Sequence, residues 1–256
     1  DVLRLSKGMS YKSSLAGVGF GGGKSVFLCD PKSKTPEMLK AFGEFLNTFN
    51  GTYIAAKDMN IEGRDLAIVK THSKHVLGVD GEEGSSGDPS PVTAYGVLKA
   101  LNATTEHLFG HSKLDGMQIA IQGLGHVGYR YAELVRKQGA EIILADVDSA
   151  VTAKAEAELG ATVVGTDEIA SVECTIFSPC ARGGVLNAKT IDGLQCMAVV
   201  GAANNQLHSE QDGLRIHEMG ILYVPDYAVN SGGIINIFVE HEGYDAQRAI
   251  RKKKKI

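Results

Sequence analysis

Short apolar runs alternate with helix-like spacing through the second half of the chain. Residues 117–122 (MQIAIQ) and 141–145 (EIILA) are brief runs bounded by turn formers, as buried strands are. The segments that follow them, 127–138 and 150–159, have the apolar spacing of helices. Further strands are expected at 161–164, 174–178, 198–201 and 221–224. Strands separated in this way predict a parallel, doubly wound sheet with both faces covered.

The first part of the chain has a different order of elements. Its pattern predicts a helix at 3–9, a glycine-rich turn, a strand at 25–29, a helix at 36–49 and a strand at 52–56. Residues 81–91 (GEEGSSGDPSP) then gather turn formers that no regular element tolerates together. A helical spacing follows over 92–108. The polar run therefore marks a domain boundary and a candidate hinge.

The net charge and the lengths of the apolar runs argue against a protein that binds nucleic acid or membranes. The 26 Lys and Arg residues and 30 Asp and Glu residues give a net charge of −4, so no broad positive field is available to hold nucleic acid or an anionic membrane. The basic run Arg251–Lys255 is interpreted as a solvated end. No apolar run reaches bilayer length, and the first residues lack the apolar region of a signal peptide. We expect a cytoplasmic chain without nucleic-acid or membrane partners.

The four cysteines do not indicate a metal or disulfide framework. They are too widely spaced for a zinc knuckle and too few for a disulfide scaffold. His107 and His111 are spaced as in HExxH, but Leu108 stands where that motif requires Glu. We expect reduced, mostly buried thiols and no metal site.

Glycine is frequent, at 31 of 256 residues, and one cluster indicates a dinucleotide site. The sequence GLGHVG comes directly after an expected strand and opens an expected helix. Its first glycine permits a tight turn, its second lets the backbone approach a pyrophosphate, and its third allows close packing of helix on strand. The helix N-terminus attracts the phosphate charge. The expected cofactor-binding residues are Gly123, Leu124, Gly125, His126, Val127 and Gly128.

Asp146 indicates which dinucleotide is bound. It lies at the end of the next strand, where a carboxylate can accept hydrogen bonds from the ribose hydroxyls. The same charge would repel a 2′-phosphate, and residues 147–149 supply no Arg or Lys to reverse that. NAD is therefore favoured over NADP. The alternative is that Asp146 only caps the following helix.

A second glycine cluster, residues 17–23, precedes Lys24 and Ser25 and invites comparison with a phosphate-binding P-loop. The register excludes that motif, because its first glycine would fall on Val18 and because a strand, not a helix, is expected after Lys24. The cluster instead allows the backbone to pack closely around a lysine at the start of a strand.

Lys12 and Lys24 together indicate an anionic substrate. One ammonium can pair with a carboxylate, while the other, if desolvated, loses proton affinity and can act as acid or base near neutral pH. Asp58 is a second proton-transfer group or a helix cap. From the residues alone, either lysine could also be an ordinary surface residue.

A series of segments carries a resemblance to a known family. In order they are LRLSKGMSYK, GVGFGGGK, YIAAKDM, SSGDPSPVTAYGV, IQGLGHVG, SPCARGG, VVGAANNQL, IHEMGILYVPDYAVNSGGIIN and AQRA. Over nearly the whole chain they resemble the glutamate, leucine, phenylalanine and valine dehydrogenase superfamily, and within it most closely the leucine dehydrogenases. The resemblance implies a partial α/β substrate domain (1–91), an NAD-binding Rossmann domain (92–231), a C-terminal segment (232–256) that returns towards the substrate domain, and a homo-oligomer.

The resemblance also implies NAD-dependent oxidative deamination of an amino acid to a 2-oxo acid and ammonia. Lys24 would activate water and stabilise charge at the carbinolamine carbon. Lys12 would hold the substrate carboxylate, and Asp58 would exchange protons with the amino group. Asn205 would contact both cofactor and substrate. The implied cofactor contacts outside the glycine motif are Asp146, Ala181, Ala203 and Asn205.

The substrate side chain is expected to be aliphatic. Ile234 and Ile237 resemble the positions that line the side-chain pocket in the family, and Ala56 beside them is small. An apolar pocket favours leucine, valine or isoleucine. One methylene changes binding by only about 1–3 kcal/mol, so the pattern does not rank these three substrates.

The chain also departs from the family pattern. Relatives are expected to begin earlier, with a strand-rich segment that completes the first domain, and to continue past AQRA. Residues 59–61 (MNI) replace a Val-Gly-Thr-like turn, Lys57 replaces a common Glu, and Asp88 a frequent Asn. Three alternatives follow: a silent NAD-binding or regulatory fragment, a related phenylalanine or glutamate dehydrogenase, or a hydroxy-acid dehydrogenase. The last would need a histidine base, and no histidine has a matching context.

Overall fold

The computed structural model describes residues 2–79, 85, 87–241 and 243. The chain divides into two compact units. The first unit comprises residues 1–89 and 233–256, and the second unit comprises residues 90–232. Each unit is described separately below.

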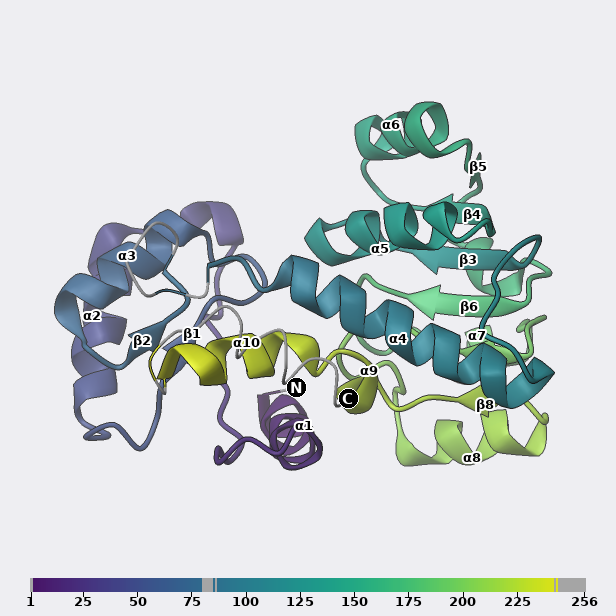
Figure 1. Ribbon diagram of the computed structural model, residues 1–256. Coiled ribbons are helices and arrows are strands. Elements are labelled where there is room, and N and C mark those ends of the chain that lie inside the picture. Colours follow the sequence, from purple (N-terminus) through teal and green to yellow (C-terminus); the bar gives the residue numbers. More distant parts are fainter. Residues whose placement is uncertain (1, 80–84, 86, 242, 244–256) are drawn as a thin grey trace. The chain divides into compact units, whose positions relative to one another are not determined.

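The second unit is built on a six-stranded parallel sheet (Figure 1). Its strands are β3 (Gln118–Gln122), β4 (Glu141–Ala145), β5 (Thr162–Val163), β6 (Ile176–Pro179), β7 (Ala198–Val199) and β8 (Leu222–Tyr223). They lie in the order β5-β4-β3-β6-β7-β8, and every neighbouring pair is parallel. This is the strand order of a doubly wound dinucleotide-binding fold, so the expected fold class is confirmed.

Helices cover both faces of this sheet. They are α4 (Ser90–Phe109), α5 (His126–Lys137), α6 (Ser149–Leu159), α7 (Ala188–Ile191), α8 (Glu210–Glu218) and α9 (Asp226–Val229), with a 3₁₀ turn at Ile169–Ser171. Alternate residues of β3 point to opposite faces, as the pleat requires. Ile119 and Ile121 enter a core with residues of α4 and α5, whereas Ala120 enters a second core with Phe177 and Ile216.

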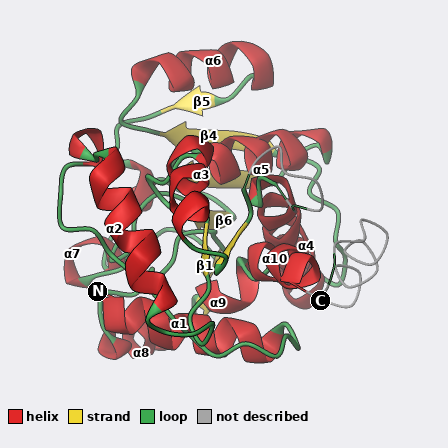
Figure 2. Ribbon diagram, turned by 90° about the vertical axis from the view of Figure 1, so that its left-hand side faces the viewer, coloured by secondary structure: helices red, strands yellow, loops and turns green. Residues whose placement is uncertain are grey.

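The first unit consists mainly of helices, with a two-stranded parallel sheet (Figure 2). Its elements are α1 (Val2–Leu15), a 3₁₀ turn at Pro31–Ser33, α2 (Pro36–Asn47), β1 (Ala55–Ala56), α3 (Gly63–His72) and β2 (Val76–Leu77). Helix α10 (Gly232–His241) starts at the unit boundary and otherwise belongs to this unit. Leu39 and Leu46 of α2 pack with Leu66 and Val69 of α3 in its core.

One strand expected from the sequence is wrong. Residues 25–28 have no regular secondary structure and Cys29 is a bend. Inward and outward side chains do alternate here, as in a strand. The ring centroids of Phe27 and Phe42 are 5.1 Å apart, while the side chains of Val26 and Leu28 are exposed. A strand also needs a hydrogen-bonded neighbour, and among the described residues none pairs with this segment.

Other boundaries moved as well. The strand expected at 52–56 is reduced to Ala55–Ala56, and α3 and β2 were not expected. Within the candidate hinge at 81–91, residues 81–84 and 86 lie outside the described residues, whereas Ser90 and Pro91 begin α4. The AQRA segment and the basic run 251–255 also lie outside the described residues. Within the described part of the chain, no helix combines the length and apolar character that crossing a membrane requires.

Candidate functional site

The glycine turn after β3 has the geometry that its sequence indicated. Gly123 has φ +95°, a conformation that strains residues with a Cβ, and its N–H donates to the Ala145 carbonyl at 2.8 Å. A Cβ on Gly128 would lie 2.0 Å from the Gly123 carbonyl oxygen. Helix α5 can therefore approach β3 this closely only with glycine at position 128.

This turn lies at the topological switch point of the sheet, where the order of the strands reverses direction. Strands β3 and β6 are neighbours, and the strands that follow them extend the sheet in opposite directions. The loop after β6 meets the glycine turn here, since a Cβ on Gly123 would lie 2.6 Å from the Ala181 Cβ. Open parallel sheets bind their ligands outside the carboxyl ends of the strands at such a point.

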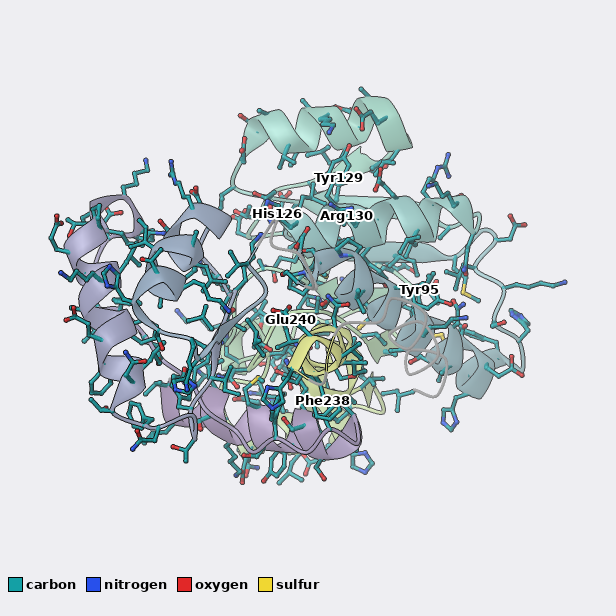
Figure 3. All side chains as sticks on the ribbon, turned by 60° about the vertical axis from the view of Figure 1, so that its left-hand side comes forward. Tyr95, His126, Tyr129, Arg130, Phe238 and Glu240 are labelled. Atoms are coloured by element: carbon teal, nitrogen blue, oxygen red, sulfur yellow. The ribbon has the colours of Figure 1, made fainter. Side chains whose placement is uncertain are left out.

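The N-terminus of α5 is open at this edge. Gly125 occupies the N-cap with φ −64°, no side chain caps the helix, and a Cβ on Gly125 would meet no atom within 4 Å. His126 begins the helix and is exposed, with Tyr129 and Arg130 one turn further along (Figure 3). Uncapped N–H groups beside open space can receive a phosphate, so the residues present fit a dinucleotide.

Asp146 is held against the glycine turn by the backbone. Its carboxylate accepts hydrogen bonds from the Leu124 N–H at 2.6 Å and the Asp148 N–H at 2.9 Å. The cap of α6 is Asp148, whose side chain accepts from the Ala150 N–H at 2.9 Å. The alternative that Asp146 is the helix cap is therefore wrong.

Ala203 and Asn205 lie on the loop after β7, at the same edge of the sheet. The Ala203 N–H donates to the Pro179 carbonyl at 3.0 Å, and the Asn205 carbonyl accepts from the Gly184 N–H at 2.7 Å. Asn205 adopts φ +52°. These bonds connect the loops after β6 and β7.

Asn230 stabilises this loop and was not anticipated from the sequence. Its Nδ2 donates to the Ala202 carbonyl and to Asn204 Oδ1, both at 2.8 Å, and the side chain is buried. The asparagine in the VNSGG segment was the available signal, since a buried amide next to glycines requires polar partners.

In the first unit, the glycines before Lys24 pack against protein rather than against a phosphate. A Cβ on Gly22 would lie 2.1 Å from the Ser6 carbonyl oxygen of α1, and one on Gly23 would lie 2.6 Å from the Tyr53 ring. Ser6 donates to the Gly22 carbonyl at 3.0 Å. The cluster therefore fixes the segment that leads to Lys24 against α1. No helix directly follows Lys24, whereas a P-loop would be followed by one, so the exclusion of that motif holds.

Lys24 and Asp58 form an ion pair in the first unit. The Lys24 side chain is 16% exposed and that of Asp58 is 45% exposed. Burial lowers the pKa of Lys24 below its ordinary value, because desolvation disfavours the ammonium form. Helix α3 begins after Glu62, so Asp58 is not its cap.

The remaining expected substrate residues also belong to the first unit. Lys12, in the last turn of α1, is 8% exposed, so the surface interpretation is wrong for both lysines. Ala56 ends β1 two residues before Asp58. Ile237 on α10 is buried over Gly78. The Gly78 N–H donates to the Glu240 carboxylate of α10 at 2.9 Å, and Glu240 is labelled in Figure 3. Ile234 is partly buried on α10.

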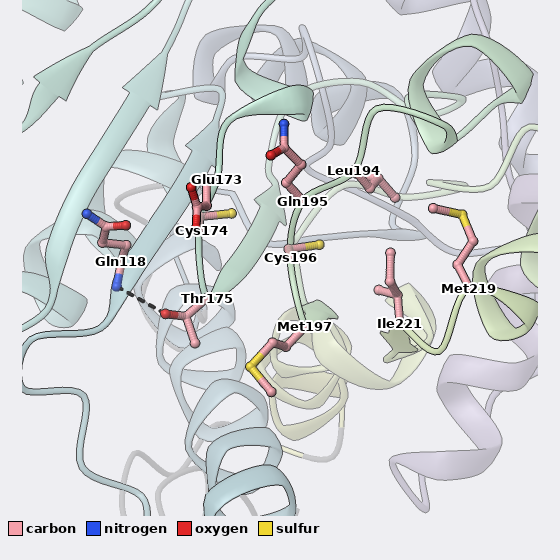
Figure 4. A pocket seen from close by; sticks show the side chains of 10 residues that line it. All are labelled: Gln118, Glu173, Cys174, Thr175, Leu194, Gln195, Cys196, Met197, Met219 and Ile221. Carbon is pink, nitrogen blue, oxygen red and sulfur yellow. Dashed lines mark hydrogen bonds between the residues drawn. The ribbon is translucent and has the colours of Figure 1, made fainter.

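A separate cavity of about 520 Å³ opens at the opposite, amino-terminal edge of the sheet (Figure 4). Gln118 lines it at the start of β3, and Thr175 and Met197 line it directly before β6 and β7, together with Cys174 and Cys196. Burial raises the pKa of Cys174 to about 12 and that of Cys196 to about 11, so both thiols are protonated at neutral pH. Among the described side chains, no three His, Cys, Asp or Glu residues are grouped as metal ligands.

A doubly wound sheet with an open glycine turn at its switch point defines a dinucleotide-binding fold, and the other unit contributes a largely buried lysine that is ion-paired with a carboxylate. Two family models give the class more closely. One, for the Glu/Leu/Phe/Val dehydrogenase dimerisation domain, matches residues 1–75. The other, for glutamate, leucine, phenylalanine and valine dehydrogenases, matches residues 84–163 and 147–254.

Individual relatives agree with these models. Leucine dehydrogenase of Geobacillus stearothermophilus is 44% identical over 257 residues, which covers 100% of this chain and 70% of the relative. Phenylalanine dehydrogenase of Lysinibacillus sphaericus is also 44% identical, over 263 residues that cover 100% of this chain and 69% of the relative. The crystal structure of L-tryptophan dehydrogenase from Nostoc punctiforme, 39% identical, superposes with a TM-score of 0.80 over 99% of this chain and 73% of that one.

The chain belongs to the Glu/Leu/Phe/Val dehydrogenase family and is an amino-acid dehydrogenase. The resemblance inferred from the sequence is thereby confirmed. The family uses NAD or NADP.

Proposed function

We propose that the protein catalyses the reversible, NAD-dependent oxidative deamination of a branched-chain L-amino acid to its 2-oxo acid and ammonia. The observation that carries this proposal is the ion pair between the largely buried Lys24 and the more exposed Asp58, in a chain that also has an open glycine turn suited to a dinucleotide. NAD, when bound, accepts hydride from the α-carbon. The other steps, addition of water to the iminium carbon and loss of ammonia, each require a proton to be moved.

Lys24 and Asp58 are proposed as the proton-transfer groups. Because burial lowers the pKa of Lys24, more of this amine is neutral near physiological pH, and it can take a proton from the attacking water. The resulting ammonium then stabilises negative charge on the carbinolamine oxygen. Asp58, ion-paired with Lys24 and more exposed, is placed to exchange a proton with the substrate amino group.

Lys12, Ala56, Ile234 and Ile237 are proposed to hold the amino acid. The buried ammonium of Lys12 suits the substrate carboxylate. The apolar side chains of Ile234 and Ile237 and the small Ala56 suit an aliphatic side chain. Asn205 is proposed to contact both cofactor and substrate. The match of residues 1–75 to a dimerisation domain supports a homo-oligomer.

NADH absorbance with separate amino acids tests the proposal. L-leucine, L-isoleucine and L-valine are expected to give the highest kcat/KM, with L-phenylalanine, L-tryptophan and L-glutamate at least tenfold lower. Aromatic substrates are included because phenylalanine and tryptophan dehydrogenases are about as similar to this chain as leucine dehydrogenases are. A preference for an aromatic substrate would overturn the branched-chain assignment alone. Absence of turnover on every amino acid, with NAD still binding, would favour a silent dinucleotide-binding fragment.

The choice of NAD over NADP is expected to depend on Asp146. Its carboxylate is fixed by two backbone N–H groups beside the glycine turn, where it would meet a 2′-phosphate. We expect Asp146→Ser to lower the NAD-to-NADP ratio of kcat/KM at least tenfold. Asp148→Ser is the matched control, because it removes a charge two residues away and keeps a helix cap, so the ratio is expected to stay within about threefold. A wild-type preference for NADP would contradict the assignment.

A further inference from the structure

We propose that Lys34 is a positioning residue for the reaction, acting with Asp65 as a clamp on the turn that carries Asp58. The Lys34–Asp65 clamp consists of the ion pair between these two side chains and their bonds to the backbone of residues 60–62. The inference rests on the proposed function, because it assumes that Asp58 must stay against Lys24 during the reaction.

The clamp holds the turn at two points. Lys34 Nζ donates to the Asn60 carbonyl at 2.5 Å and pairs with the Asp65 carboxylate. The same carboxylate oxygen accepts the Glu62 N–H at 3.0 Å. One lysine from the segment before α2 and one aspartate from α3 thus fix both sides of residues 60–62.

The turn transmits this constraint to Asp58. The Ile61 N–H closes the turn on the Asp58 carbonyl at 3.0 Å, and the Met59 N–H donates to Asp58 Oδ1 at 2.7 Å. Asp58 Oδ2 is thereby left for Lys24. Asn60 has φ +59°, a conformation that only glycine and a few residues such as asparagine adopt readily. Asn at this position therefore keeps the turn conformation that a glycine would allow.

The burial of the clamp supports a geometric role. Lys34 is 13% exposed and Asp65 10% exposed. Desolvation by burial raises the pKa of Asp65, but the hydrogen bonds from Lys34 and the Glu62 N–H, together with the positive charges of Lys34 and Arg64, outweigh it and leave that pKa below its ordinary value. A buried ion pair of this kind contributes little net stability compared with apolar side chains, whereas it imposes a defined geometry on the groups that it binds.

The test replaces the pair without changing net charge. The double variant Lys34→Met with Asp65→Asn removes one positive and one negative charge and leaves the side chains of Lys24 and Asp58 in place. The control is Lys40→Met with Glu44→Gln, which removes a similar lysine–carboxylate pair on the exposed face of α2. Both proteins are compared with wild type by steady-state kinetics across pH on the amino acid that gives the highest activity.

We expect the clamp variant to lose about tenfold or more in kcat, with the amino-acid KM changed less than threefold because Lys12 is unaffected. The rise of kcat/KM with pH that is assigned to Lys24 is expected to move to lower pH, because a lysine that loses its carboxylate partner loses proton affinity. The control is expected to match wild type in all three quantities. A clamp variant with wild-type kcat and an unshifted pH limb would overturn the proposal, as would a loss that the control shares.

A second measurement does not depend on turnover. The pH dependence with which Lys24 reacts with acetic anhydride, read by mass spectrometry, is expected to shift to lower pH in the clamp variant only. If wild type had no deaminase activity but the clamp variant still showed the shift, the proposed function would be refuted and the clamp would stand. If wild type were active but the clamp variant showed no shift, the clamp would be refuted and the proposed function would stand. Should the double variant not fold, Asp65→Asn alone is expected to shift both readouts in the same direction by a smaller amount, and no shift would overturn the clamp.

Discussion

Replacing Lys24 with Met is expected to lower kcat for amino-acid deamination by about 10²- to 10⁴-fold, the usual contribution of a positioned acid–base group. Methionine keeps the length and apolar stem of lysine, so the contacts of the 17–23 segment with α1 are retained. NAD affinity is expected to stay within twofold, because Lys24 belongs to the first unit and the glycine turn belongs to the second. Kinetics with NADH absorbance and an NADH fluorescence titration measure the two effects.

The pH profile separates a chemical role of Lys24 from a structural one. In wild type, kcat/KM is expected to rise with pH through the lowered pKa of Lys24, as the neutral amine becomes available to accept a proton. The residual activity of Lys24→Met is expected to lack this limb. Lys40→Met, at an exposed site on α2, serves as the control and is expected to keep both rate and limb. Unchanged turnover in Lys24→Met would refute the assignment.

The second unit could be predicted closely because its signals are local and periodic. Strand 141–145 was placed at its observed bounds, since an apolar run between two turns has little freedom to shift. The glycine motif indicated the turn at Gly123 because each glycine has a steric reason that sequence spacing encodes. The short β5, β7 and β8 were expected two residues longer than observed, because the ends of a strand depend on its neighbours.

The first unit was less predictable, since its structure depends on contacts between distant segments. Residues 25–29 have strand-like alternation but no neighbouring strand among the described residues. The pairing of Lys24 with Asp58 joins residues 34 positions apart, and only the resemblance indicated that both serve one site. The roles of Lys34 and Asp65 had no sequence signal, because an ion pair between a loop and a helix follows no periodicity.

Two neighbouring glycines of the dinucleotide turn are expected to respond to alanine in opposite ways. A Cβ at Gly128 would lie 2.0 Å from the backbone oxygen of Gly123, which cannot move without opening the turn. Overpacking of this kind costs about 1–3 kcal/mol. At roughly 2–4 °C per kcal/mol, Gly128→Ala is expected to lower Tm by about 2–12 °C, with loss of NAD binding as a consequence.

Gly125→Ala is the matched case in which the fold has room for the added methyl group. The position has φ −64° and no atom within 4 Å of the new Cβ, so Tm is expected to change by less than about 2 °C. The methyl group would nevertheless occupy the space in which the backbone approaches the pyrophosphate, and NAD affinity is expected to fall tenfold or more, equivalent to about 1.4 kcal/mol. Thermal unfolding and NADH fluorescence titration measure both variants. If Gly125→Ala bound NAD as wild type does, the open space at the α5 N-terminus would not be the pyrophosphate site.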